Sequence, residues 1–358
     1  MKLAALRAPD SLVVVRLGAM GDIVHTLYAL TALRSALPAT RIGWVVEARW
    51  AELLAAKGAA RQGPRNPTRP LVDSLHLVNT KAWRRAPFQR HTRQEVSSAW
   101  QEIRAQHYQL AADFQGATKS ALVAKAAAAN QIVGMSNPRE SLARLFYHQR
   151  IPNDRPHVVE QYQALAAAIA DRPLVLTGAQ LPRDEESEAE AARRTGEWGR
   201  EFVVLSPGAG WGAKRWPAER YAEVARAVWR DGFLSLINLG PEEHELATVI
   251  ERAAPQGVRR FTGSLGELIA LTRRARLFVG GDSGPLHLAA ALEIPLVALF
   301  GPTDPRRNGP YSAKGVVLRN PASKTSLSHT ARPDPGLLGI STEEVICAVR
   351  RTLGKPHA

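Results

Sequence analysis

The feature that most limits the fold of this chain is a repeated alternation of short apolar runs with segments of helical periodicity. Leu12–Leu17 is apolar apart from Arg16, which is typical of a strand buried on both faces. Apolar residues then recur at helical spacing from Ile23 to Leu37, and Pro38 ends the pattern. Such alternation predicts a parallel sheet covered by helices. In the first half we predict further strands at 41–48, 74–80, 108–114 and 131–135, and a helix at 118–129.

The second half repeats this rhythm, and the length of 358 residues also favours two domains. The expected fold class is therefore α/β, with two Rossmann-like, doubly wound parallel sheets that face a central cleft. We predict strands at 201–208, 233–240, 276–281 and 295–301, and helices at 217–229, 243–253, 265–275, 285–292 and 342–353. The predicted division is an N-terminal domain at 1–175, a linker at 176–200, a C-terminal domain at 201–340, and a C-terminal helix and tail at 341–358.

Composition argues against several classes of protein. Apolar residues make up 45% of the chain, which is more than a disordered protein carries. The single cysteine, Cys347, excludes an internal disulfide and favours a reducing compartment. No stretch of about 18 uninterrupted apolar residues occurs, so we expect no membrane span. Arg7, Pro9 and Asp10 interrupt the apolar N-terminus, which argues against an export signal.

Positive charge is concentrated in the first half. Lys and Arg exceed Asp and Glu by 14 overall, and residues 1–170 hold 22 basic against 11 acidic side chains. Between 49 and 104 the counts are 11 and 4. A one-sided positive field attracts anions, so nucleic acid, anionic lipid and a phosphorylated substrate are candidate partners. A basic protein without such a partner is the alternative. An aromatic content of 6% argues against the stacking surface of a nucleic-acid-binding protein.

Open parallel sheets bind ligands at the carboxyl ends of their strands, so the loops after strands carry the functional information. The first is GAMGD (18–22), in which two glycines allow a tight turn close to a ligand. Its Gly-x-x-Gly spacing differs from the Gly-x-Gly-x-x-Gly of dinucleotide-binding enzymes, which argues against a nicotinamide oxidoreductase. Asp22 has two interpretations: it caps the following helix, or it does chemistry in the cleft.

The loop SPGAGWGAKRWP (206–217) combines small residues with Lys214 and Arg215, just before a predicted helix. Backbone N–H groups, a helix N-terminus and a cation together suit a phosphate or diphosphate. The alternative is a flexible loop with a solvated basic pair.

In the loop GGDSGPLHL (280–288) a predicted strand leads into a helix whose free N–H groups also suit an anion. Asp282 either caps this helix or contacts the ligand. His287 is either a satisfied core histidine or a functional one. The Gly-x-Ser-x-Gly pattern is absent around Ser283, so we reject a serine hydrolase.

Glu242 and Glu243 follow a predicted strand in NLGPEEHE (238–245). A carboxylate there can accept hydrogen bonds from ribose hydroxyls, or it can be a solvated residue of the first helical turn. No metal site is predicted, because one cysteine and ten scattered histidines show no paired ligand spacing.

Four segments resemble, in order, the signature loops of the ADP-heptose:lipopolysaccharide heptosyltransferases, glycosyltransferase family 9: GAMGDIVHTL, SPGAGWGAKRWP, GGDSGPLHL and LFGPTDP. Three further segments look most like heptosyltransferase I, which adds the first heptose to the Kdo region of lipid A. They are DFQGATKSA (113–121), RESLARLFY (139–147) and HVVEQYQAL (157–165). The resemblance implies the GT-B fold and an inverting, metal-independent transfer from ADP-heptose, with no cofactor.

The resemblance also implies roles for individual residues. Asp22 corresponds to the family's general base, and Lys214 corresponds to the lysine near the donor phosphates. Glu243 is expected to contact the ribose. The remaining residues expected at the donor site are Gly21, Ser206, Gly208, Asp282, Ser283, Gly284 and His287.

The acceptor implied by the resemblance is an anionic glycolipid at the inner membrane. The residues expected to bind it are Arg84, Arg85, Lys119, Arg139 and Arg144. The enzyme is then expected to be a monomer in the cytoplasm, peripheral on the inner face of the membrane, that binds no nucleic acid. A GT-B transferase with another nucleotide-sugar or acceptor is the near alternative. A basic nucleic-acid-binding protein is the alternative of another class.

Overall fold

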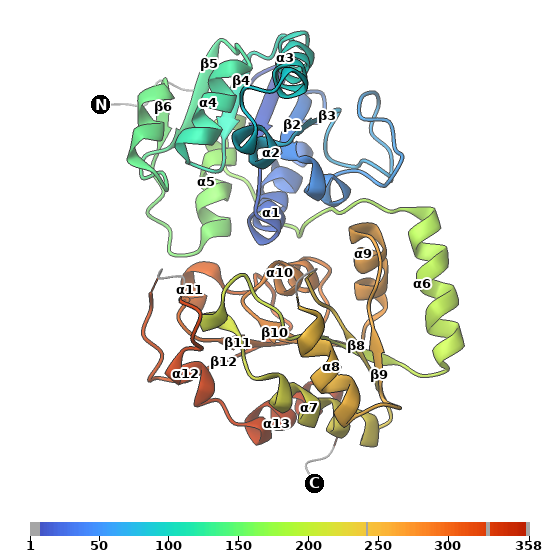
Figure 1. Cartoon of the computed structure of the whole chain (residues 1–358). Coiled ribbons are helices and arrows are strands. Elements are labelled where there is room, and N and C mark those ends of the chain that lie inside the picture. Colours follow the sequence, from blue (N-terminus) through green and yellow to red (C-terminus); the bar gives the residue numbers. More distant parts are fainter. Residues whose placement is uncertain (1–7, 241–242, 327–329, 356–358) are drawn as a thin grey trace. The chain divides into compact units, whose positions relative to one another are not determined.

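The computed structural model describes residues 8–240, 243–326 and 330–355 of the chain. These residues form two compact units, Met1–Asp184 and Glu185–Ala358 (Figure 1). The division after Asp184 falls within the segment 176–200 that the sequence predicts as a linker.

The first unit is built on a six-stranded parallel sheet with the strand order β3-β2-β1-β4-β5-β6. The order reverses beside β1, because β2 and β4 pair with its two edges. Loops that follow strands at such a switch point can approach a ligand. The strands are β1 (Ser11–Val15), β2 (Arg41–Glu47), β3 (Ser74–Val78), β4 (Leu110–Asp113), β5 (Gln131–Met135) and β6 (Gln149–Ile151).

Helices cover both faces of this sheet. The first of them, α1, is buried along most of its length, because it packs against α5 as well as the sheet (Figure 1). The helices are α1 (Met20–Ala36), α2 (Thr80–Arg85), α3 (Arg90–Arg104), α4 (Thr118–Ala126) and α5 (Val158–Ala170), with 3-10 turns η1 (Ala48–Leu53) and η2 (Ser141–Phe146).

The second unit holds another six-stranded parallel sheet, with the order β12-β11-β10-β7-β8-β9. Its switch point lies at β7, between β10 and β8. The strands are β7 (Phe202–Ser206), β8 (Leu234–Ile237), β9 (Val258–Arg260), β10 (Leu277–Gly281), β11 (Leu296–Phe300) and β12 (Gly315–Arg319).

Two apolar cores lie on opposite faces of this second sheet. One joins the sheet to α7, α8 and α13, and the other joins it to α6, α9 and α10. The helices are α6 (Glu185–Trp198), α7 (Ala218–Arg230), α8 (His244–Ala253), α9 (Leu265–Arg274), α10 (Gly284–Ala291), α11 (Pro305–Asn308), α12 (Pro335–Leu338) and α13 (Thr342–Leu353), with the 3-10 turn η3 (Gly212–Lys214).

The predicted fold class, two doubly wound parallel sheets, is confirmed. The prediction missed three strands at sheet edges, β6, β9 and β12, of which β6 and β9 have only three residues each. An edge strand is half-exposed, so its sequence lacks the continuous apolar run of a central strand. The acidic run at 184–190, predicted within the linker, lies mostly inside α6, where carboxylates in the first turn interact favourably with the helix dipole.

Candidate active site

The loop GAMGD connects β1 to α1 at the switch point of the first sheet. The helix begins at Met20 with Ala19 as its N-cap, so Asp22 is the third helical residue. Asp22 is therefore not the N-cap residue itself, but it helps to cap α1 from the third helical position. Its carboxylate does accept a hydrogen bond from the Ala19 N–H, at 3.3 Å. The Asp22 side chain remains 40% exposed, which leaves it accessible to a substrate.

A buried arginine holds the Asp22 carboxylate. Arg16 directly follows β1, and its Nη2 lies 2.8 Å from Asp22 Oδ2. Its Nη1 donates to the Phe114 carbonyl at 2.8 Å, and its guanidinium lies 5.4 Å from the Tyr162 ring centroid. Burial alone would lower the pKa of Arg16, but Asp22, Tyr162 and Asp113 together raise that pKa above its usual value. The guanidinium therefore stays charged and fixes one oxygen of Asp22.

Asp113, at the end of β4, organises the neighbouring turn. Its buried carboxylate accepts hydrogen bonds from the N–H groups of Gln115 and Gly116, at 2.8 and 3.0 Å. The hydroxyls of Ser120 and Tyr147 donate to its other oxygen, at 2.9 and 2.7 Å. Burial raises the pKa of Asp113, although these hydrogen bonds oppose the shift. This network holds the turn that also receives Arg16.

In the second unit, the loop 206–217 is held by Glu243 from the start of α8. Glu243 accepts hydrogen bonds from the Ala209 N–H at 3.2 Å, from the Gly240 N–H at 2.9 Å and from Arg215 Nη2 at 3.1 Å. Its carboxylate also packs directly against Gly208. Glu243 is therefore tied to the loop and is not a solvated residue of a first helical turn. Glu242 lies outside the described residues.

Replacing Gly208 by alanine should lower the free energy of unfolding by about 1–3 kcal/mol. A Cβ at Gly208 would lie 1.8 Å from Glu243 Oε2, so Glu243 would have to give up its hydrogen bonds. Gly210→Ala is the matched control, because its Cβ would meet no described atom within 4 Å. Urea unfolding of the full chain compares the two variants. An equal loss in both would contradict this packing argument.

Lys214, Asp282 and His287 form a buried chain of polar contacts. Lys214 Nζ forms a short ion pair with Asp282 Oδ2, and His287 Nε2 lies 3.1 Å from Asp282 Oδ1. The three side chains are 10%, 8% and 6% exposed. Burial alone would raise the pKa of Asp282, but His287 and Lys214 outweigh that effect and lower it well below its usual value. Asp282 is therefore a buried carboxylate with two partners.

These contacts correct two alternatives. Lys214 is not solvated, because it is buried against Asp282, whereas Arg215 is 41% exposed and bonds to Glu243. Asp282 does not cap α10, whose N-cap is Ser283. His287 is buried, as a core histidine would be, but its ring nitrogen faces the Asp282 carboxylate.

Two buried hydroxyls lie at the carboxyl ends of neighbouring strands. Ser283 follows β10 and precedes Gly284, the first residue of α10, while Thr303 follows β11. Neither Ser283 Oγ nor Thr303 Oγ1 has a hydrogen-bond partner among the described residues. Buried hydroxyls without partners are rare in proteins and point to a ligand or to water. Ser206 lies at the end of β7, where its Oγ is 3.5 Å from Asn238 Nδ2.

The predicted acceptor residues all lie in the first unit. Arg84 and Arg85 form the exposed last turn of α2, whose first residue, Thr80, accepts a hydrogen bond from Lys119 Nζ at 2.9 Å. Arg139 precedes η2, next to the turn at Gly116, and Arg144 lies within η2. Within the described residues, Lys119 is the one cation of this set with an ion pair, since its Nζ lies 3.8 Å from Glu47 Oε1. Because η2 packs on α4, the structure brings Lys119, Arg139 and Arg144 onto adjoining segments.

The described residues contain no group of three or more His, Cys, Asp or Glu side chains arranged to hold a metal ion. Within the same residues, no helix is long and apolar enough to cross a membrane.

Comparison with known proteins identifies the family. Residues 96–334 match the model described as glycosyltransferase family 9 (heptosyltransferase). The chain is also 30% identical to lipopolysaccharide heptosyltransferase 1 of Pseudomonas aeruginosa, over 94% of this chain and 93% of that protein. The chain belongs to glycosyltransferase family 9. The predicted family and the predicted class of enzyme, a glycosyltransferase, are both confirmed.

Solved structures of the same family share the fold of this glycosyltransferase. The Escherichia coli heptosyltransferase WaaC with ADP superimposes with a TM-score of 0.78 at 25% identity, covering 96% of this chain and 99% of that one. The same E. coli enzyme with ADP-2-deoxy-2-fluoro heptose gives a TM-score of 0.72 at 25% identity, covering 95% and 99%.

Three residues that the sequence analysis did not single out lie next to the predicted site residues or at the same strand ends. They are Arg16, which pairs with Asp22, Asp113, which holds the adjoining turn, and Thr303, with its buried hydroxyl. Arg16 had a detectable signal, since a lone cation inside a buried strand segment needs a partner. Asp113 begins the segment DFQGATKSA and Thr303 lies in LFGPTDP, both of which resemble family segments, but residue type alone did not distinguish these two within them.

Proposed function

We propose that this enzyme transfers heptose from ADP-heptose to the Kdo/lipid A inner core of lipopolysaccharide, with inversion and without a metal ion. The observation that carries the proposal is the 30% identity, over nearly the whole chain, to a lipopolysaccharide heptosyltransferase 1. The E. coli relative with ADP and with a fluorinated ADP-heptose supports the choice of donor.

The donor is proposed to bind to the loops at the strand ends of the second unit. The diphosphate meets Lys214 and the N–H groups at the start of α10, where a helix N-terminus favours an anion. The Lys214 ammonium donates one of its three N–H groups to Asp282, so two N–H groups remain to donate to phosphate oxygens. The buried hydroxyls of Ser283 and Thr303 are further donors. Gly21, Ser206, Gly208, Gly284 and His287 complete the proposed donor contacts.

Glu243 is proposed to contact the ribose of the donor. A carboxylate has about four acceptor positions, and Glu243 uses three of them for Ala209, Gly240 and Arg215. The remaining position suits one ribose hydroxyl, while the other three hold the loop in place.

The chemical step is proposed to be a single displacement. The acceptor hydroxyl oxygen bonds to the anomeric carbon as the bond from that carbon to the phosphate oxygen breaks. Asp22 takes the hydroxyl proton, and ADP leaves with the bonding electron pair. A carboxylate suits this role because the hydroxyl becomes acidic only as the new bond forms. Arg16 is proposed to position Asp22 by holding Oδ2, which leaves Oδ1 for the proton. Lys214 offsets the charge on ADP.

The acceptor is proposed to bind the first unit through Arg84, Arg85, Lys119, Arg139 and Arg144, whose charges suit phosphates and carboxylates. The proposed enzyme acts as a monomer in the cytoplasm, on the inner face of the membrane, and does not bind nucleic acid. The N-terminal domain, 1–175, is proposed to bind the acceptor, and the C-terminal domain, 201–340, is proposed to bind the donor.

Calorimetric titration should find that ADP binds about tenfold more tightly than UDP or GDP, a difference of about 1.4 kcal/mol. The Asp22→Asn variant should bind ADP as the unmodified enzyme does, because the proposed ADP contacts other than Gly21 lie in the second unit. Equal affinity for UDP or GDP would instead favour a family 9 transferase with another nucleotide-sugar donor.

A further inference from the structure

The turn between α2 and α3 carries the most exposed large apolar side chain among the described residues. Phe88 is 83% exposed. A single exposed apolar residue is normal on a protein surface and by itself means little. Its surroundings make Phe88 unusual, because it lies among cations and beside an apolar hollow.

Five cations flank this ring, and none of them is paired with a residue that the structure describes. They lie on α2 and at the start of α3, and all are exposed: Lys81, Arg84, Arg85, Arg90 and Arg93. None forms an ion pair or a side-chain hydrogen bond with any described residue. Glu95 is the one acidic residue between positions 80 and 100, and it accepts a hydrogen bond from Trp83 Nε1 at 2.9 Å. The α2–α3 hairpin therefore presents uncompensated positive charge.

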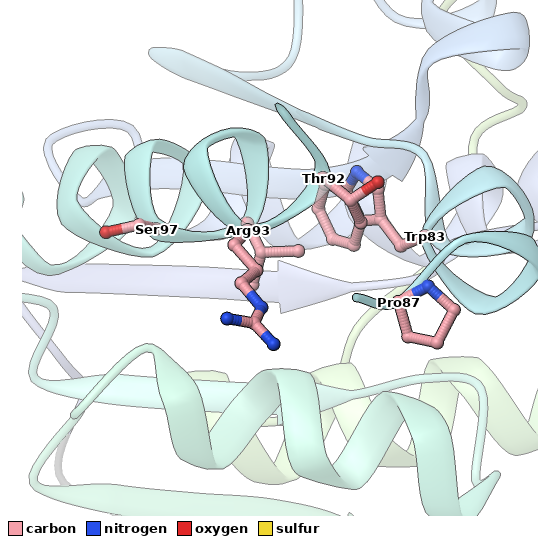
Figure 2. A pocket seen from close by; sticks show the side chains of 6 residues that line it. Trp83, Pro87, Thr92, Arg93 and Ser97 are labelled. Atoms are coloured by element: carbon pink, nitrogen blue, oxygen red, sulfur yellow. The ribbon is translucent and has the colours of Figure 1, made fainter. Parts of the chain in front are cut away.

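An apolar hollow lies at the base of the same hairpin. It measures about 390 Å³ and is lined by Trp83, Pro87, Thr92, Arg93, Val96 and Ser97. Figure 2 shows Trp83 and Pro87 at one end of this hollow, with Arg93 and Ser97 following along α3. The Trp83 ring packs edge-on against Trp100, at 6.1 Å between centroids, which supports the wall of the hollow from inside. The apolar surface is thus built on rigid aromatic packing.

We infer that the α2–α3 hairpin docks on an anionic phospholipid bilayer, with Phe88 entering the headgroup region and Lys81, Arg90 and Arg93 contacting lipid phosphates, while Arg84 and Arg85 serve the proposed acceptor. An aromatic ring flanked by arginines matches the border between headgroups and acyl chains. Each cation close to an anionic membrane contributes on the order of 1 kcal/mol. Nucleic acid is a less suitable partner for this hairpin, because stacking of bases needs several exposed aromatic rings. Phe88 is the one highly exposed apolar ring among the described residues of the hairpin. This inference rests on the proposed function, which places the acceptor in a membrane.

The test is co-sedimentation of the full chain with phosphatidylcholine vesicles, with or without phosphatidylglycerol. We expect binding to the anionic vesicles only, weakening as salt rises. Phe88→Ser should weaken it about tenfold, from lost apolar contact, and Arg90→Gln about fivefold, from one lost charge. Val175→Ser is the matched control, because Val175 is 78% exposed in the same unit but away from the hairpin. It should leave binding unchanged.

Two results would overturn the inference: equal binding of Phe88→Ser and unmodified protein, or no binding of the unmodified protein to anionic vesicles that lack the acceptor glycolipid. Transfer to a water-soluble acceptor should be unchanged in Phe88→Ser, which separates docking from catalysis. The vesicles carry neither donor nor acceptor, so vesicle binding and heptosyl transfer are tested separately. Loss of vesicle binding with intact transfer would count against the docking inference alone. Vesicle binding without transfer would count against the proposed function alone.

Discussion

Asp22→Asn should lower kcat about 100- to 10,000-fold, the range expected when a general base is lost. The amide is isosteric and retains an oxygen for the Arg16 guanidinium and the Ala19 N–H, so the loop should keep its geometry. It cannot accept the proton of the acceptor hydroxyl. Release of ADP from ADP-heptose in the presence of acceptor measures the loss, and thermal unfolding monitors the fold.

Asp154→Asn is a suitable control for this variant, because Asp154 is an exposed carboxylate of the same unit outside the candidate site. It should leave kcat unchanged. Turnover of Asp22→Asn within a few-fold of the unmodified enzyme would remove Asp22 from the role of base. A loss of activity that follows a loss of folded protein would show instead that the Arg16–Asp22 pair acts through stability.

Asp282→Asn should have the largest effect on stability, lowering the free energy of unfolding by about 3–5 kcal/mol, as expected when a buried charge loses its partner. Lys214 would remain only 10% exposed without a carboxylate, and His287 would lose its acceptor. Urea unfolding of the full chain at neutral pH measures the cost. Asp231→Asn is the matched control, because Asp231 pairs with Arg350 nearer the surface of the same unit. Its cost should be much smaller than that of Asp282→Asn, because an ion pair near the surface contributes little to stability.

The same carboxylate should make stability fall in acid. Asp282 has a pKa in the folded state well below its usual value, so as the pH falls the unfolded chain takes up this proton first. Its contribution to stability is complete above the ordinary aspartate pKa of about 3.9 and is lost as the pH falls toward the lowered pKa. The stability difference between unmodified protein and Asp282→Asn should therefore shrink below pH 4. A difference that stays constant between pH 7 and pH 3 would contradict the assignment.

Much of the fold follows from local pattern. Continuous apolar runs such as Val13–Val15 and Val203–Leu205 are fully buried central strands, and these are the strands that the sequence predicts. The last helix, Thr342–Leu353, has its predicted bounds because a serine N-cap and a glycine after its end mark both termini locally. The edge strands β6 and β9 were not predicted, because each has only three residues and neither is buried on both faces.

The amino-acid sequence by itself determined the fold class, the family and the loops in which functional residues lie, because periodicity and turn chemistry act over a few neighbouring residues. Only the tertiary structure decided which side chains meet. Arg16 reaches Phe114 across 98 positions, and Lys214 reaches Asp282 across 68. These pairs form because strand order places the ends of β1 and β4, and of β7 and β10, side by side. A buried charge needs a partner, but its own sequence neighbourhood does not say which strand will supply it.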